Sequence, residues 1–245
     1  MGDVSRGMAN GADERVQLFL RTLTDMFQHP NFEKSLEFFI ASFSRERDDL
    51  GQWRAYADNG RGFATGVAPR LFRVVDQPAE GMLPEFAGPV VYDLAQALGR
   101  QGEALDEAVK VFIEAVEANA EIVSEPAVGI AFMQALARET LAAPIIWNCL
   151  TSKHPAYAHE REVRLVIMGT PEKLSPHVKT RLRGSEIVPY IAHSMPLRER
   201  YHIAEIVVGP AAPAGAERDL RTMLKSLGIT EEFPISRSGI PYRAS

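Results

Sequence analysis

The residue types best suited to chemistry lie in the segment 154–166, where two carboxylates stand two positions apart. If this segment is a strand, Glu160 and Glu162 share one face, because side chains alternate between the two faces of a strand. Two carboxylates on one face are unfavourable unless they are solvated, paired or functional. Arg161 and Arg164 are near enough in the chain to pair with them. The pattern therefore allows an exposed strand edge with weak ion pairs, or a catalytic or ligand-orienting carboxylate at the mouth of a cleft.

A second polar segment, 42–66, carries hydroxyl and aromatic residues around an expected strand–helix–strand. Ser42 and Ser44 precede the expected helix, and turn glycines follow it. Trp53 and Tyr56 are three positions apart, so they lie on one face of that helix. These two aromatic residues are either part of the core or the wall of a ligand site, where a ring stacks on a flat ligand.

Two further segments are more polar than a buried core requires. The polar segment 238–243 ends an expected extended stretch, 234–243, whose last residues, 241–243, are expected to follow the sheet, and a pairing of Arg243 with Glu160 is one option. Lys179, Arg181 and Arg183 alternate along an expected strand and therefore share one face. We expect that face to be solvated, with a phosphate clamp as the alternative.

The overall charge and the absent motifs exclude several classes of protein. The formal net charge is −5, from 27 Lys+Arg and 32 Asp+Glu, which argues against a generally basic nucleic-acid-binding surface but leaves a local patch open. Cys149 is the one cysteine, so an internal disulfide and a cysteine zinc site are excluded, and its apolar neighbours predict a buried, inert thiol. No metal is expected, because among the six histidines only His154 and His159 approach a ligand spacing.

Hydropathy predicts a cytoplasmic protein that does not span a membrane. No stretch approaches 18 apolar residues, and the first residues lack an apolar signal segment.

The order of the expected elements favours an α+β fold, because strands lie on both sides of a helical block without regular alternation. Short apolar or alternating runs predict strands at 38–43, 63–67, 71–75, 90–92, 163–168, 178–182, 186–191 and 203–208. Apolar residues at helical spacing predict helices over 13–27, 48–57, 93–143 and 215–227. Within 93–143 we expect two helices, the first ending at Pro126 and the second at Pro144.

This pattern predicts one main domain. Residues 1–12 are expected to be a disordered lead-in. Residues 13–245 are expected to form a single α+β domain with a split mixed or antiparallel sheet, in which 102–143 is an inserted helical pair.

Several of these segments, in the same order, resemble the uncharacterised bacterial family DUF2971. The resemblance extends from about Phe39 to Arg243. The segments that carry it are IASFSRERDDLGQWRAYADNGRGFATGV (40–67), VVYD (90–93), KHPAYAHEREVRLVI (153–167), VPYI (188–191), IAEIVVGP (203–210) and SGIPYR (238–243). Members of the family usually begin with a strand that bears a His-Tyr-Thr or Lys-Tyr motif, and the region before Phe39 has only a helix and a polar lead-in.

The same pattern looks, more loosely, like that of ADP-ribosyltransferases, which bind NAD in a cleft of a split α+β fold. This resemblance implies that Glu160-Arg161-Glu162 is a Glu-x-Glu element with Glu162 and Glu160 as catalytic residues. It also implies that NAD is the substrate and that four residues bind it: Ser44, Trp53, Tyr56 and Arg164. In such a reaction, a carboxylate stabilises the oxocarbenium-like ribose that forms when nicotinamide leaves.

Two functions follow as alternatives. The first is an NAD-dependent ADP-ribosyltransferase-like or NAD glycohydrolase-like enzyme of phage defence or a toxin system, with a protein or nucleic-acid acceptor. The second is a non-catalytic regulatory or interaction domain that keeps the fold but lacks the N-terminal strand motif.

Overall fold

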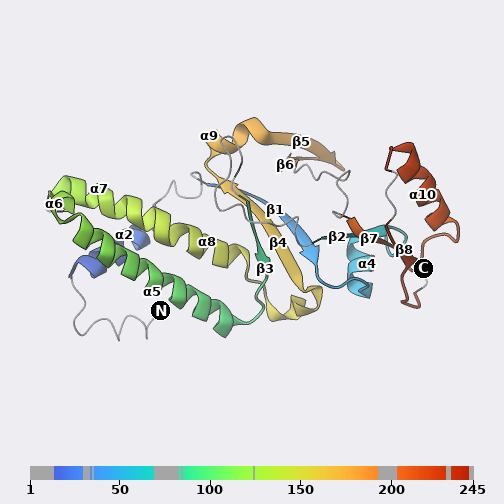
Figure 1. Ribbon diagram of the computed structural model, residues 1–245, viewed down its shortest axis with the longest axis horizontal. Coiled ribbons are helices and arrows are strands. Elements are labelled where there is room, and N and C mark those ends of the chain that lie inside the picture. Colours follow the sequence, from blue (N-terminus) through green and yellow to red (C-terminus); the bar gives the residue numbers. More distant parts are fainter. Residues whose placement is uncertain are drawn as a thin grey trace. The chain divides into compact units, whose positions relative to one another are not determined.

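The computed structural model describes residues 14–29, 34, 36–68, 83, 85–123, 125–192, 203–229 and 233–242. The chain divides into two compact units (Figure 1). The helical unit comprises Met1–Leu36 and Val90–Ala158, and the sheet unit comprises Glu37–Pro89 and His159–Ser245. Helices and strands together make the α+β class that the sequence predicted.

In the helical unit one long helix packs against several shorter helices. Its helices are α2 (Glu14–Gln28), α5 (Leu94–Ala118), α6 (Ala120–Val123), α7 (Pro126–Ala137) and α8 (Ala143–Leu150). Phe19 of α2 stacks on Phe112 of α5, with ring centroids 4.4 Å apart. The same core includes Val109, Val116 and Met133, and the apolar residues of α5 that contribute to it recur every three or four positions.

The expected helix end at Pro144 is wrong. A π-helical turn, η2 (Arg138–Ala142), joins α7 to α8, and Pro144 lies in the first turn of α8. A proline is tolerated there because its missing N–H would lack a helical partner in any case. The prediction of a buried thiol is also wrong, since Cys149 on α8 is exposed.

The sheet unit contains three small sheets. In the first, β4 (Glu162–Gly169) lies between β1 (Glu37–Ser44) and β3 (Glu85–Pro89), and both pairings are antiparallel. In the second, β7 (Ile203–Val208) pairs antiparallel with β2 (Phe63–Val67) and parallel with β8 (Ile235–Arg237). The third is the hairpin β5 (Val178–Arg183) and β6 (Glu186–Ile191). The central strands β4 and β7 supply buried aliphatic side chains to the core of this unit.

The strand predictions are largely confirmed, with one shift and one segment that lies outside the described residues. The predicted strand at 90–92 lies earlier, at Glu85–Pro89, and Val91 makes only an isolated bridge to Ser152. Pairing with β4 sets this register, and a short apolar run alone does not reveal the partner. The predicted strand at 71–75 lies outside the described residues.

Short helices connect the strands of this unit. They are α4 (Leu50–Tyr56), α9 (Pro171–Leu174), the 3₁₀ turn η4 (Ser175–His177) and α10 (Ala216–Ser226). A further 3₁₀ helix, η3 (Pro155–Glu160), leads into β4. Within the described part of the chain, no helix combines the length and the hydropathy needed to cross a bilayer.

Candidate functional site

The chain turns sharply after β1, and local hydrogen bonds fix this turn. Ser44 Oγ donates to the carbonyl oxygen of Glu160 (2.7 Å) and accepts from the backbone N–H of Glu46 (3.0 Å). Asp49 then caps α4, because its carboxylate accepts from the N–H of Gln52 at 2.9 Å. The loop 45–49 is thereby held between the end of β1 and the start of a helix.

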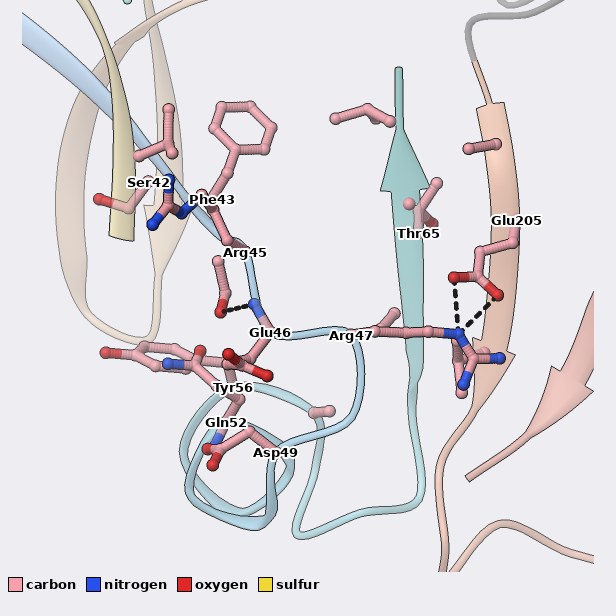
Figure 2. A pocket seen from close by; sticks show the side chains of 18 of the residues that line it. Ser42, Phe43, Arg45, Glu46, Arg47, Asp49, Gln52, Tyr56, Thr65 and Glu205 are labelled. Atoms are coloured by element: carbon pink, nitrogen blue, oxygen red, sulfur yellow. Dashed lines mark hydrogen bonds and ion pairs between the residues drawn. The ribbon is translucent and has the colours of Figure 1, made fainter. Parts of the chain in front are cut away.

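A cavity of about 740 Å³ opens beside this loop (Figure 2). Its walls come from the end of β1, the loop 45–49, α4 and the whole of β2, with smaller parts of β3, β4 and β7. All of these elements belong to the sheet unit. The volume lies within the range of about 300–1,000 Å³ that is typical of small-molecule sites.

The two predicted aromatic residues both line the cavity, with very different exposure. Tyr56 is 75% exposed, whereas Trp53 is 3% exposed. The Trp53 indole N–H donates to Asp48 at 2.6 Å, so this ring is anchored as a wall. Most of the Tyr56 side chain is therefore exposed beside the cavity, and Trp53 supports the helix that carries it.

Asp48 ties the loop to the C-terminal polar segment. Its carboxylate accepts hydrogen bonds from Trp53, from Ser238 Oγ (2.6 Å) and from the N–H of Gly239 (2.9 Å). Partial burial acts to raise the pKa of Asp48, but these hydrogen bonds and the charge of Arg47 outweigh it and hold the pKa below its usual value. The segment 238–242 thus stabilises the cavity wall. Arg243, which the sequence suggested as a partner of Glu160, lies outside the described residues.

Two arginines leave the loop in different directions (Figure 2). Arg47 Nε donates to both carboxylate oxygens of Glu205, at 2.7 and 2.8 Å, and Arg47 Nη2 donates to Ser236 at 2.6 Å. The Arg45 guanidinium has no hydrogen-bond or ion-pair partner among the described residues, although it lines the cavity. In Figure 2 the side chains of Ser42, Arg45 and Tyr56 extend to one side of the loop, and Arg47 extends to the other.

Glu162 does not line the cavity, but it touches a residue that does. Ser42 Oγ donates to Glu162 Oε1 at 2.5 Å. Arg164 donates twice to the same carboxylate, through Nε at 2.9 Å and through Nη2 at 3.2 Å. The Glu162 side chain is only 6% exposed and that of Arg164 17%. Ser44 is paired with Glu162 in the β1–β4 register, so the two side chains share a face of this sheet.

The two predicted catalytic carboxylates do not share a strand face. Glu160 ends η3 and lies outside β4, whereas Glu162 is the first residue of β4. Arg161 between them has φ +44°, a left-handed conformation that breaks the alternation. Its carbonyl accepts from the N–H of Arg45 at 3.0 Å, and its guanidinium pairs with Glu46. This junction therefore fastens the loop 45–49 to the start of β4.

Sequence reasoning missed three residues of the site: Ser42 as the partner of Glu162, Arg45 as a cation of the cavity, and Asp48 as the anchor of Trp53. The spacing of Ser42 and Ser44 carried a usable signal, since residues two apart on a strand share a face. Nothing in the sequence marks which of the arginines after β1 has a partner. In the described ranges, no group of three or more His, Cys, Asp or Glu side chains is placed to hold a metal ion.

Comparison with known proteins gives a match to one family model over part of the chain. Residues 52–165 match the family model described as Protein of unknown function (DUF2971). The family predicted from the sequence is thereby confirmed over this segment, which is somewhat less than half of the chain and shorter than the predicted range. It includes α4, β2, β3 and Glu162. Neither the curated proteins nor the solved structures contain a match.

Proposed function

We propose that the cavity binds NAD and that the chain acts on the bond between nicotinamide and ribose. The observation that carries this proposal is the pairing of Arg45 and Tyr56 in one cavity of about 740 Å³. The Arg45 guanidinium has no partner among the described residues, and Tyr56 is 75% exposed. A guanidinium suits a pyrophosphate, and a phenol ring suits a flat heterocycle.

The network around Glu162 supplies the chemistry in this proposal. When the nicotinamide–ribose bond breaks, both bonding electrons leave with neutral nicotinamide and positive charge develops on the ribose. A fixed carboxylate stabilises that charge. Water then attacks the ribose carbon and releases a proton to solvent, which yields ADP-ribose. In the transferase version of the reaction, an acceptor group takes the place of water.

Ser42 connects the cavity to this carboxylate. It lines the cavity and donates to Glu162 Oε1 at 2.5 Å. Arg164 donates to both carboxylate oxygens and so holds the second one in place. We assign Glu162 the electrostatic role, and Ser42 and Arg164 the role of positioning it. The carbonyl oxygen of Glu160 accepts the hydrogen bond of Ser44 and so helps to fix the turn. We assign the Glu160 carboxylate the role of positioning the acceptor group.

Binding is tested by calorimetric titration of NAD into three variants of the protein. Tyr56→Ala and Arg45→Ala should each weaken NAD binding at least about tenfold, since each removes one anchor. The matched control is Arg54→Ala, because Arg54 is an exposed arginine on the same helix as Tyr56 and does not line the cavity. Equal losses in Arg45→Ala and Arg54→Ala would refute the assigned site.

Turnover is tested by nicotinamide release from NAD, with and without a cell lysate as the source of acceptor. Glu162→Gln should lower the rate by about 10²-fold or more, while NAD affinity changes little, because the carboxylate acts mainly in the transition state. Retained NAD binding by this variant also shows that its cavity is folded.

A non-catalytic ligand-binding domain is the second candidate, and one observation favours it. Glu162 is buried and its carboxylate is already hydrogen-bonded by Arg164 and Ser42. In that case the protein binds NAD with the same dependence on Arg45 and Tyr56, but releases no nicotinamide above the buffer rate. The binding and turnover measurements together separate the two candidates.

A further inference from the structure

We propose that one face of the β5–β6 hairpin binds the phosphate backbone of single-stranded nucleic acid. This basic face consists of Lys179, Arg181 and Arg183 of β5 together with Tyr190 of β6. It is distinct from the NAD cavity, whose walls include no residue of either strand. The proposal therefore does not depend on the proposed function.

The register of the hairpin places these side chains together. Lys179 is paired with Tyr190, and Arg183 is paired with Glu186. Residues paired across an antiparallel ladder share a face, as do residues two apart on one strand. The Arg181 guanidinium lies over the Tyr190 ring, 5.6 Å from its centroid. Successive cations are about 6.6 Å apart along the strand, so the face is a row of positive charge with an aromatic ring beside it.

The charge of this row is available to a partner. All three cationic side chains are exposed, and no described residue forms an ion pair with any of them. Glu186 is the one carboxylate on this face of the two strands. The chain as a whole carries −5, so the row is a local exception to an acidic protein. The net negative charge of the chain opposes the binding of a polyanion elsewhere on its surface. A polyanion therefore contacts the protein at this basic face.

The arrangement favours nucleic acid over an anionic membrane. Leu182 and Ile187, 75% and 71% exposed, are paired with each other on the opposite face of the hairpin. A bilayer that took up those apolar side chains would turn the cations away from its surface. Tyr190 instead lies among the cations, where a base can stack while the arginines contact the flanking phosphates. Cations beside an aromatic platform are typical of single-strand binding.

The experiment measures the fluorescence anisotropy of a labelled oligothymidylate of about 20 nucleotides, titrated with the full chain at low salt. We expect micromolar to submicromolar affinity with a slope of log K against log salt near −2, as three cations neutralise about three phosphates. The triple variant Lys179→Ala/Arg181→Ala/Arg183→Ala should lose at least about tenfold in affinity. Tyr190→Leu should lose at least about fivefold with an unchanged salt slope, because it removes stacking and no charge.

The control removes the same charge elsewhere. Arg218→Ala/Arg221→Ala/Lys225→Ala on α10 also removes three exposed cations, so both triple variants have three positive charges fewer than the wild type. It should bind like the wild type. Equal losses in the two triple variants, tighter binding of duplex than of single strands, or binding to anionic vesicles in place of oligonucleotides would each overturn the proposal. Circular dichroism of each variant verifies the fold. If the hairpin triple variant binds the oligonucleotide as tightly as the wild type, the proposal is also rejected.

Discussion

Glu162 combines burial with charge, and its partners decide what a substitution costs. Its carboxylate receives hydrogen bonds from Ser42 and from two nitrogens of Arg164. Removal of one member of a buried ion pair leaves the other charge without compensation, whereas an exposed pair contributes little. The sequence indicated that Arg161 and Arg164 could pair with the two glutamates. Arg164 does pair with Glu162, whereas the Arg161 guanidinium pairs with Glu46, which the sequence did not indicate.

We predict that Glu162→Gln lowers the free energy of unfolding by about 3 kcal/mol or more, because the Arg164 guanidinium loses the negative charge of the carboxylate to which it donates twice. Glu46→Gln should cost less than about 1 kcal/mol, because the Glu46–Arg161 pair is largely exposed. Urea unfolding of both variants measures the difference. The double variant Glu162→Gln/Arg164→Met should recover part of the loss, since it removes the positive member of the pair as well. Equal costs in the two single variants would contradict this account of the pair.

Asp48 should give the protein an acid-sensitive contribution to stability. Its pKa is held below the ordinary value of 3.8 in the folded protein, so the unfolded chain binds the proton more readily. The contribution is therefore present above about pH 4 and is lost as the pH falls through the lowered pKa of the folded state. Urea unfolding of the wild type and of Asp48→Asn from pH 3 to pH 7 tests this. The stability difference should be largest at neutral pH and shrink in acid, and a difference that is constant with pH would exclude the charged hydrogen bonds as its source.

At the scale of elements, the junction between η3 and β4 differs most from what the sequence predicts. An unbroken strand would place Glu160 and Glu162 on one face, but the left-handed Arg161 separates them. No residue type marks this position, because arginine has no preference for positive φ. The conformation is imposed by the tertiary contacts of Arg161 with Arg45 and Glu46.

This junction makes a testable distinction between two substitutions. Arg161→Gly and Arg161→Ala both remove the pair with Glu46, but only glycine adopts φ +44° without steric cost. We expect Arg161→Gly to be more stable than Arg161→Ala by about 1 kcal/mol in thermal unfolding. At Arg54, on α4, the order should reverse, because glycine is unfavourable inside a helix.

Other elements could be predicted because local patterns determine them. Leu105, Val109, Phe112 and Val116 recur at helical spacing and do form the core side of α5. The alternation of β5 and the apolar runs of β4 and β7 also gave the correct strands. Pairings between distant segments, such as Ser42 with Glu162 or Asp48 with Ser238, could not be predicted, because they depend on which strands and loops become neighbours.

At the scale of the whole molecule, the chain distributes its roles over separate regions. One unit is helical, with its own apolar core around Phe19 and Phe112. The other contains the cavity and, on different strands, the basic face of the hairpin. The charge balance of the whole chain indicated an acidic protein, and the alternation along 178–182 indicated that its cations gather on one face. Only the register of β5 with β6 reveals that Tyr190 lies beside them.

The central claim is that the cavity beside the loop 45–49 is the NAD site. Amide hydrogen exchange of the full chain, with and without saturating NAD, tests it most directly, since it reports where a ligand stabilises the backbone. The account predicts slower exchange in 42–57 and 63–67, and unchanged exchange in the hairpin 178–191. Unchanged exchange throughout the chain, or protection that is confined to other segments, would contradict the account.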